Sequence, residues 1–194
     1  MTIEELTLPE IRDIYRRRLK KDFPPDEVKP LSRIEASAAK GRYICYGMKD
    51  GRDILAYGFF AVTENRFLFD YFAVREDLRG TGIGSRFLRE LCSSRMKDAA
   101  CVLLEVDDPA AADSAAEKTL RERRVRFYRK NGLRDTGARA RTFGVDFLIL
   151  ELPVGEPHGR KEAGEIYAMI YRAILPERIY AREVHIEQDE PENG

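Results

Sequence analysis

Apolar side chains dominate residues 67–74, a run of about the length of one strand. Such a run is typical of a strand that is covered on both faces. Further along, apolar residues recur at helical spacing, and these are Ile83, Phe87, Leu88, Leu91 and Cys92. Gly80, Gly82 and Gly84 lie between the strand and the body of this helix. The pattern therefore predicts a strand, a glycine-rich loop and a helix over residues 66–96.

The segment before this unit predicts two helices and two strands. Residues 7–10 have the sequence of a capping box, with a proline in the first turn, and so begin a helix. A shorter helix is expected from about Pro30. Strands over residues 42–48 and 53–62 flank a turn signal at Asp50 and Gly51, and a meander with the 66–74 strand follows. Residues 2–6 could form only a short first strand.

The segment after this unit predicts a buried strand, a helix, a hairpin and one more helix. The strand covers residues 101–106, and the helix runs from a cap at Ser114 to a stop at Gly132. The hairpin covers residues 134–141 and 145–152, and the last helix covers 163–175. This order predicts an α/β (α+β) fold, in which a mixed, mostly antiparallel sheet of about six to seven strands has helices on both sides.

Composition narrows the class of protein. Of the 194 residues, 43% are hydrophobic and 35% are charged, which suits one soluble domain with an appendage. Lysine and arginine balance aspartate and glutamate at 34 each, so net charge draws the chain neither to nucleic acid nor to an anionic membrane. The start lacks the basic segment of a signal peptide, and no apolar stretch has membrane-spanning length. Three scattered cysteines suggest buried thiols in a reducing compartment, so a cytoplasmic location is expected.

The glycine-rich loop is the first candidate site. Glycines at a turn from strand to helix allow close approach of a ligand to the backbone, and the helix dipole favours an anion there. A dinucleotide ribose would need an acidic residue on the next strand, and a nucleotide with magnesium would need a Gly-Lys-Ser/Thr sequence. Neither is present. The loop therefore predicts a phosphate site of another kind.

Two sequence motifs indicate which phosphate-containing ligand this loop would bind. The segment Tyr71-Phe72-Ala73-Val74, followed five residues later by Arg79-x-x-Gly82-x-Gly84, resembles the acetyl-CoA motif of the GNAT superfamily of N-acetyltransferases. Residues 127–133, Phe-Tyr-Arg-Lys-Asn-Gly-Leu, resemble the helix end that follows in that family, and residues 104–106 resemble its preceding strand. The resemblance covers about residues 30–152. It implies a GNAT domain over residues 1–152, a C-terminal extension over 153–186 and an acidic tail over 187–194, which is expected to be disordered.

The resemblance also implies site residues. The predicted acetyl-CoA contacts are Phe72, Ala73, Val74, Arg79, Gly80, Thr81, Gly82, Ile83, Gly84 and Tyr128, with acetyl-CoA as the acyl donor. Tyr128 resembles the tyrosine near the CoA sulfur and is a candidate general acid. Glu105 occupies the position of a general base in several family members, and its apolar neighbours would raise its pKa. Asp70, within the apolar run, is the rival base, and a water relay without a dedicated base is a third option.

Three residues are candidates for contact with the acceptor. Phe23 and Glu27, in the loop between the first two helices, and Asp146, on the last strand, are candidate contacts with the acceptor. Arg121 and Arg124 replace the asparagine and the small residue common in the family, and they could contact a CoA phosphate or an acceptor carboxylate. The basic run that contains them could instead suggest RNA binding, but zero net charge and the lack of interleaved aromatics argue against it.

The sequence thus predicts an acetyl-CoA-dependent N-acetyltransferase that acts by direct transfer to the primary amine of an unidentified small molecule or peptide. The alternative is a CoA-binding regulatory domain without turnover. His158 and His185 have no ligand-like spacing, so no metal site is expected. Neither nucleic acid nor membrane is an expected partner. The extension could cover the domain, line the acceptor site or form a homodimer contact.

Overall fold

The computed structural model describes residues 1–25 and 27–187. Its strands are β1 (Thr2–Glu5), β2 (Tyr43–Asp50), β3 (Asp53–Thr63), β4 (Arg66–Val74), β5 (Cys101–Asp107), β6 (Arg134–Thr142), β7 (Val145–Glu151) and β8 (Val184–Ile186). Its α-helices are α1 (Leu8–Ile14), α2 (Lys20–Asp22), α3 (Leu31–Ala38), α4 (Ile83–Ser93), α5 (Ala115–Lys130), α6 (Arg160–Ile174) and α7 (Glu177–Glu183). A π-helical turn, η1 (Tyr15–Leu19), joins α1 to α2, and 3-10 turns form at η2 (Glu76–Leu78) and η3 (Pro109–Ala111). Apart from Glu187, the expected acidic tail lies outside the described residues.

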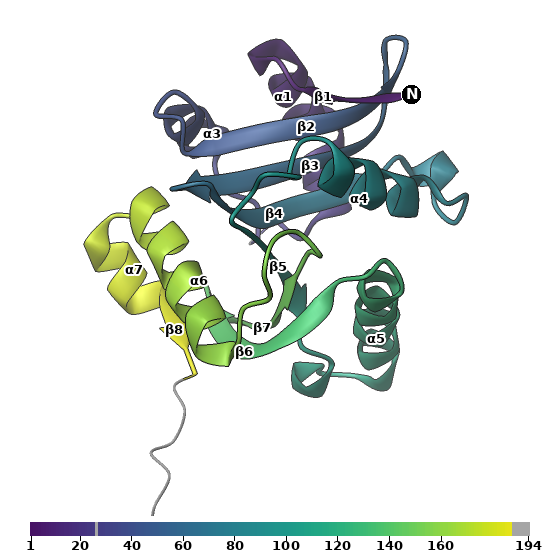
Figure 1. The fold of residues 1–194 in the computed structure, drawn as a ribbon. Helices are drawn as coiled ribbons and strands as arrows, with labels where there is room; N and C mark the ends of the chain where they lie inside the picture. Colours follow the sequence, from purple (N-terminus) through teal and green to yellow (C-terminus); the bar gives the residue numbers. More distant parts are fainter. Residues whose placement is uncertain (26, 188–194) are drawn as a thin grey trace, which may run out of the picture.

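The strands form one sheet in the order β1-β2-β3-β4-β5-β7-β6-β8 (Figure 1). Neighbouring strands are antiparallel except for β4 and β5, which are parallel. The predicted mixed, mostly antiparallel sheet is therefore confirmed, with eight strands instead of six to seven. The difference has two causes: the short β1 does form, and β8 adds three residues of the extension to the edge of β6.

Helices cover both faces of the sheet (Figure 1). On one face, apolar residues of α1, α3 and α6 pack on Tyr57, Phe59 and Tyr71. On the other face, α4 and α5 pack on Phe60 and Phe69. The helix α6, from the C-terminal extension, contributes fully buried side chains to the first core, among them Tyr167 and Ile170. The extension thus shares a hydrophobic core with the amino-terminal helices.

The sheet is interrupted where β4 meets β5. Their parallel pairing runs only from Arg66 opposite Cys101 to Phe69 opposite Leu104, although both strands continue beyond. Across the other edge of β4, Phe59 pairs with Tyr71 and Phe60 with Phe69, so Asp70 is the extra residue of a β-bulge. Bulges redirect side chains and are common beside active sites. The end of the β4–β5 pairing and the bulge therefore lie at the same place, next to Asp70 and Glu105.

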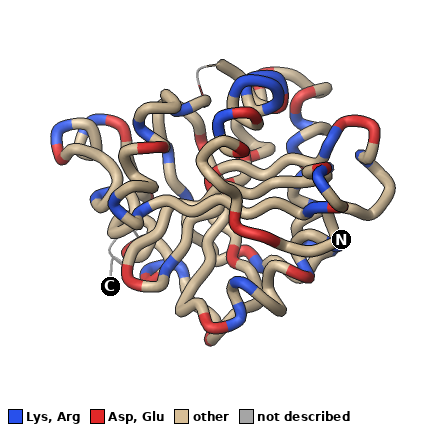
Figure 2. The backbone as a smooth tube through the Cα atoms, turned by 90° about the horizontal axis from the view of Figure 1, so that it is seen from above, with Lys and Arg blue, Asp and Glu red and all other residues tan. Residues whose placement is uncertain are grey.

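Charged residues of both signs are interspersed over the view in Figure 2, in keeping with the balanced composition. Among the described residues, no helix combines the length and the apolar character that crossing a membrane requires.

Candidate active site

The glycine-rich loop begins α4. Gly82 is the N-cap residue with φ of +91°, and Gly80 has φ of +82°, a region that other residues rarely adopt. A Cβ added at either glycine would meet no atom within 4 Å, so the surface of the loop is open. A Cβ on Gly84 would lie 3.2 Å from the ring of Phe127, so this glycine serves packing. Since the first amides of a helix lack partners within it, the open loop can bind an anion.

Arg79 connects this loop to the amino-terminal helices. Its Nη2 lies 2.5 Å from Oδ1 of Asp22, and its Nε donates to the carbonyl of Val74. The second oxygen of Asp22 accepts a 2.9 Å hydrogen bond from the hydroxyl of Tyr57. The guanidinium of Arg18 lies over the Tyr57 ring, 4.7 Å from its centre. Arg79 therefore lies beside the glycines of the loop and belongs to a cluster with Asp22, Tyr57 and Arg18. Asp22 is the last residue of α2, so the cluster also fixes the end of that helix.

The end of β4 presents backbone rather than side chains toward β5. Phe72 stacks on Phe87 with ring centres 5.2 Å apart, and Val74 packs in the same core, while Ala73 faces the opposite core. Among the described residues, no strand pairs with residues 70–74 on the side of β5. The backbone groups of this edge are thus the ones available to a ligand between the strands.

Asp70 is paired by two donors on the side of α1 and α3. Its Oδ1 lies 2.6 Å from Nζ of Lys29, and its Oδ2 accepts a hydrogen bond from the hydroxyl of Tyr43. The side chain of Asp70 is only 5% exposed. Burial by itself would lower the pKa of Lys29, but Asp70, through its charge and its hydrogen bond, together with Tyr71 and Glu105, outweighs this effect and raises that pKa. Asp70 is therefore an ion-paired carboxylate.

The loop that carries Lys29 is held by Tyr71. The hydroxyl of Tyr71 donates to the carbonyl of Glu27 at 2.8 Å and accepts from the backbone amide of Lys29 at 2.9 Å. The ring of Phe23 meets the Tyr71 ring edge-on, with centres 5.0 Å apart. Two predicted acceptor contacts, Phe23 and Glu27, thus lie next to the residue that follows Asp70.

Glu105 has a different environment from Asp70. Its Oε1 accepts hydrogen bonds from the hydroxyl groups of Tyr167 and, at 2.8 Å, Tyr171, both on α6. Burial raises the pKa of Glu105 to about 7, and the charge of Asp70 adds to the rise. The charge of Lys29 and the two tyrosine hydrogen bonds act in the opposite direction. Glu105 is thus a carboxyl group that can accept and release a proton near neutral pH.

Tyr128 lies on α5, on the other face of the sheet from α6. Its ring packs edge-on to Phe127 with centres 5.3 Å apart. Burial raises its pKa, although Arg124 opposes the rise, so the hydroxyl keeps its proton at neutral pH. Within the described chain the Tyr128 hydroxyl has no hydrogen-bond partner. Such a hydroxyl is available to a ligand.

Other predicted contacts are engaged within the protein. Arg124 pairs with Asp107 at 2.7 Å, and Arg121 pairs with Glu117 at 2.6 Å and also donates to the carbonyl of Asp108. Asp146 pairs with Arg141 across the last hairpin, Nη1 to Oδ2 at 3.1 Å. Among the described residues no contact joins Asp146 to Asp70 or Glu105. The structure brings together Asp70, Glu105, Phe23 and Glu27, and leaves Asp146 apart.

Four residues of this site escaped the sequence analysis, namely Lys29, Tyr43, Tyr167 and Tyr171. Only the tyrosines of α6 carried a signal, because Tyr167 and Tyr171 are spaced four apart on the apolar face of a predicted helix. Spacing of this kind is as typical of core packing as of a site. The pairing of Lys29 and Tyr43 with Asp70 depends on tertiary contacts that no local pattern reveals.

Comparison with known proteins agrees with this geometry. Residues 41–134 match the model of the acetyltransferase (GNAT) domain family. A GNAT-family protein from Bacteroides thetaiotaomicron is similar in structure with a TM-score of 0.67, 18% identity, and coverage of 88% of this chain and 96% of that one. The comparison with curated proteins found no match to this sequence.

Two further structures are enzymes of stated activity. The ribosomal-protein-S18-alanine N-acetyltransferase of Escherichia coli has a TM-score of 0.56 and 20% identity, covering 80% of this chain and 94% of its own. An aminoglycoside 6'-N-acetyltransferase complexed with coenzyme A has a TM-score of 0.57 and 15% identity, covering 81% and 99%. Residues 41–134 of the chain therefore match the acetyltransferase (GNAT) domain, as the sequence motifs indicated, and the chain shares the fold of this family, whose acyl donor is acetyl-CoA.

Proposed function

We propose that this protein is an N-acetyltransferase that moves the acetyl group of acetyl-CoA directly to a primary amine of a small molecule or peptide. The observation that carries the proposal is Glu105, a partly buried carboxyl group that accepts two tyrosine hydrogen bonds, has a pKa raised to about 7 and lies where the pairing of β4 and β5 ends. A general base is most effective when its pKa lies near the working pH. The acyl donor follows from the family, and the acceptor is the open part of the proposal.

The open loop at residues 80–82 and the unpaired edge of β4 would hold the donor. Backbone amides of the α4 N-terminus suit the pyrophosphate, with Arg79 beside them. The pantetheine arm would lie along residues 72–74, where no strand occupies the edge facing β5. Arg121 and Arg124 stay predicted CoA contacts, and a phosphate would have to compete there with Glu117 and Asp107.

The two faces of the sheet would then serve different steps. On the face of α6, Glu105 would take a proton from the acceptor ammonium and leave a neutral amine that can attack the thioester carbonyl carbon. The amine nitrogen would form a bond to that carbon and lose its extra proton to solvent as the carbon–sulfur bond breaks. On the face of α5, the free hydroxyl of Tyr128 would give its proton to the departing thiolate, and the phenolate would regain a proton from solvent. Asp70, paired with Lys29 and Tyr43, fits the role of base less well than Glu105.

Tyr167 and Tyr171 would act through Glu105. Their hydroxyl groups hold the carboxyl group from the side of α6 and favour its ionised form. A base held in one orientation transfers protons more effectively than a mobile one. The C-terminal extension would in this way complete the acceptor side of the site rather than lie outside it.

The acceptors of the similar enzymes do not define one class of amine. The similar enzymes act on an alanine of ribosomal protein S18 and on aminoglycosides, which differ widely in size. Likeness at this level of identity concerns the fold, so neither acceptor transfers to this chain. Phe23 and Glu27 contact Tyr71, the residue after Asp70, and stay candidate acceptor contacts, whereas Asp146 would need an acceptor that extends along the last hairpin.

A screen for thiol release tests the proposal. Acetyl-CoA is incubated with the protein and with amines of several classes, including polyamines, aminoglycosides and peptides with free amino termini. Release above background hydrolysis, with an acetylated amine confirmed by mass spectrometry, is the expected result. If acetyl-CoA raises the melting temperature but no amine in a broad screen gives release, the chain is a CoA-binding regulatory domain without turnover.

A further inference from the structure

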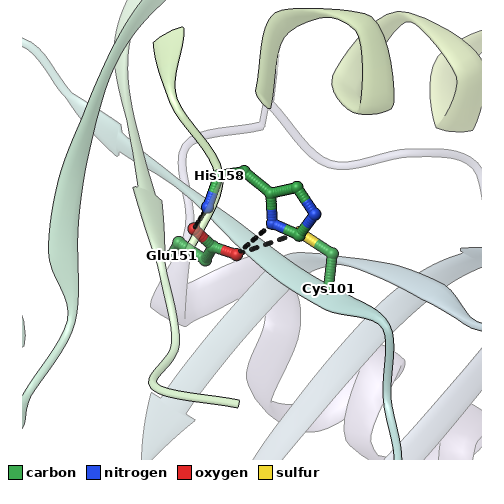
Figure 3. A group of neighbouring side chains, drawn as sticks. All are labelled: Cys101, Glu151 and His158. Carbon is green, nitrogen blue, oxygen red and sulfur yellow. Dashed lines mark hydrogen bonds and ion pairs between the residues drawn. The ribbon is translucent and has the colours of Figure 1, made fainter. Parts of the chain in front are cut away.

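A second cluster of reactive side chains lies at the opposite end of β5 from Glu105. Figure 3 shows the side chains of Cys101, Glu151 and His158 pointing toward one another. Each offers one ligand atom, and these three atoms lie within 4.8 Å of one another. Cys101 begins β5, Glu151 ends β7, and His158 precedes α6 by two residues. Three separate segments thus converge on one point.

The geometry of the cluster suits a tetrahedral metal ion. Glu151 Oε1 lies 2.7 Å from Nδ1 of His158 and 3.4 Å from Sγ of Cys101. Zinc bonds of about 2.0 to 2.3 Å would set the ligand atoms about 3.3 to 3.6 Å apart. The carboxylate–thiol distance lies within this range, the carboxylate–imidazole distance is about 0.6 Å shorter, and the third distance is at most 4.8 Å, so adjustments of about an ångström would suffice. Thiolate, imidazole and carboxylate together are a ligand set typical of zinc.

Neighbouring groups orient the Glu151 carboxylate in the way that supporting groups orient the ligands of metal sites. Its other oxygen, Oε2, forms an ion pair with Arg134 and accepts the backbone amide of His158 at 3.2 Å. This leaves Oε1 to face the thiol and the imidazole. Glu151 and Cys101 are fully buried, whereas the His158 side chain is 23% exposed, so an ion and a water ligand have a path on that side.

From these contacts we propose that Cys101, Glu151 and His158 form a zinc site with water as the fourth ligand. Binding releases the thiol proton to solvent, and the Nδ1 proton of His158 moves to Nε2, so that both atoms carry lone pairs toward the ion. Because burial raises the pKa of the Cys101 thiol, the thiol is protonated until the metal displaces its proton. The site would fasten the segment before α6, the helix that reaches Glu105, and it does not depend on the proposed transferase activity.

Zinc binding to the full chain tests the proposal. The purified protein is stripped with a chelator, loaded with Zn²⁺ and passed over a desalting column, and retained zinc is measured. One equivalent per chain and a higher melting temperature are expected, since a ligand of the folded state stabilises it. Loading with Co²⁺ should give the near-ultraviolet absorption of a cobalt–thiolate bond. Failure to retain zinc, or cobalt binding without the thiolate band, would overturn the proposal.

Matched variants assign the ligands. His158→Gln can still donate to Glu151 but cannot ligate through an imidazole, so zinc affinity should fall at least about tenfold. Cys101→Ser keeps a small donor and should abolish the cobalt–thiolate band. His185→Gln and Cys92→Ser change the other histidine and the half-buried thiol, and both should bind like the parent. If the control variants lose zinc instead, the metal binds elsewhere and the assignment is wrong.

Discussion

At Glu105, burial and hydrogen bonding act on the same carboxyl group in opposite directions. Burial disfavours the charge, while Tyr167, Tyr171 and Lys29 favour it, and burial prevails. The folded protein therefore holds this proton to a higher pH than the unfolded chain, whose carboxyl has a pKa near 4.5. A group with a raised pKa in the folded state stabilises the fold below the unfolded pKa and loses that contribution as pH rises through the folded pKa.

This difference predicts how Glu105→Gln changes stability. At about pH 4 the variant and the parent should have similar free energies of unfolding, because the parent carboxyl is protonated in both states. Between about pH 4.5 and 7 the parent should lose stability relative to the variant, by at most about 3 kcal/mol. Urea denaturation of both proteins across this range measures the difference. A constant difference over the whole range would contradict a raised pKa at Glu105.

Tyr171→Phe should move the same titration. The substitution removes one hydrogen bond that favours the ionised carboxyl and keeps the ring, so the pKa of Glu105 should rise further. The acidic limb of kcat/KM should shift to higher pH. Tyr180→Phe is the matched control, because Tyr180 is a buried tyrosine of the extension that makes no contact with Glu105. Equal effects of the two variants would mean that Tyr171 acts only in packing.

Tyr128→Phe separates proton donation from packing on the other face. The variant keeps the ring against Phe127 and loses the only proton that the side chain could give. Acetyl-CoA binding should persist while turnover falls about 10²- to 10⁴-fold, the usual range for general acid catalysis. Thermal shift and steady-state thiol release measure the two quantities. Turnover at the parent rate would show that another group, or water, protonates the thiolate.

Residue roles differed in how far the sequence could assign them. The motif resemblance made Tyr128 and Glu105 candidates, and the apolar neighbours of Asp70 made it the rival base, since an acid in an apolar run predicts either pairing or use. The structure separates the two by their partners: an ammonium group for Asp70 and two hydroxyl groups for Glu105. Lys29 lies 41 residues from Asp70 in the chain, so no local pattern could reveal the pair.

The loop before α4 is the element that should bind the donor. Gly82→Glu would place a side chain and a negative charge in the open space at the helix N-terminus, where the pyrophosphate is expected. The rise in melting temperature with acetyl-CoA should largely disappear. Gly41→Glu is the matched control. Gly41 also has positive φ and open surroundings, but it precedes the strand β2 and does not begin a helix. If both variants bind acetyl-CoA like the parent, the loop does not hold the donor.

Elements with strong local signals were predicted closely. The capping serine, Ser114, accepts from the amide of Glu117, and Gly132 has φ of +88° at the end of α5, both as expected. By contrast, α7 and β8 went unpredicted, because each is short and held by partners distant in the chain. The cluster of Cys101, Glu151 and His158 was missed for the same reason: its members are 50 and 7 residues apart, and only the sheet brings them together.

For the whole molecule, the C-terminal extension is the part that the family motifs did not describe. Its helix α6 adds apolar residues to one core and two hydroxyl groups to Glu105, and β8 extends the sheet beyond β6. The catalytic proposal therefore spans both faces of the sheet. The proposed donor loop and Tyr128 belong with α4 and α5, whereas the proposed base, Glu105, contacts two tyrosines of α6.

The pH dependence of thiol release by the parent and by Glu105→Gln tests the central claim most directly. With an amine found by the screen, parent kcat/KM should rise with pH through an inflection near 7, as the carboxyl ionises and can accept a proton. Glu105→Gln should turn over more slowly and lack that inflection. A variant with the parent rate and the parent inflection would contradict the assignment of Glu105 as the base.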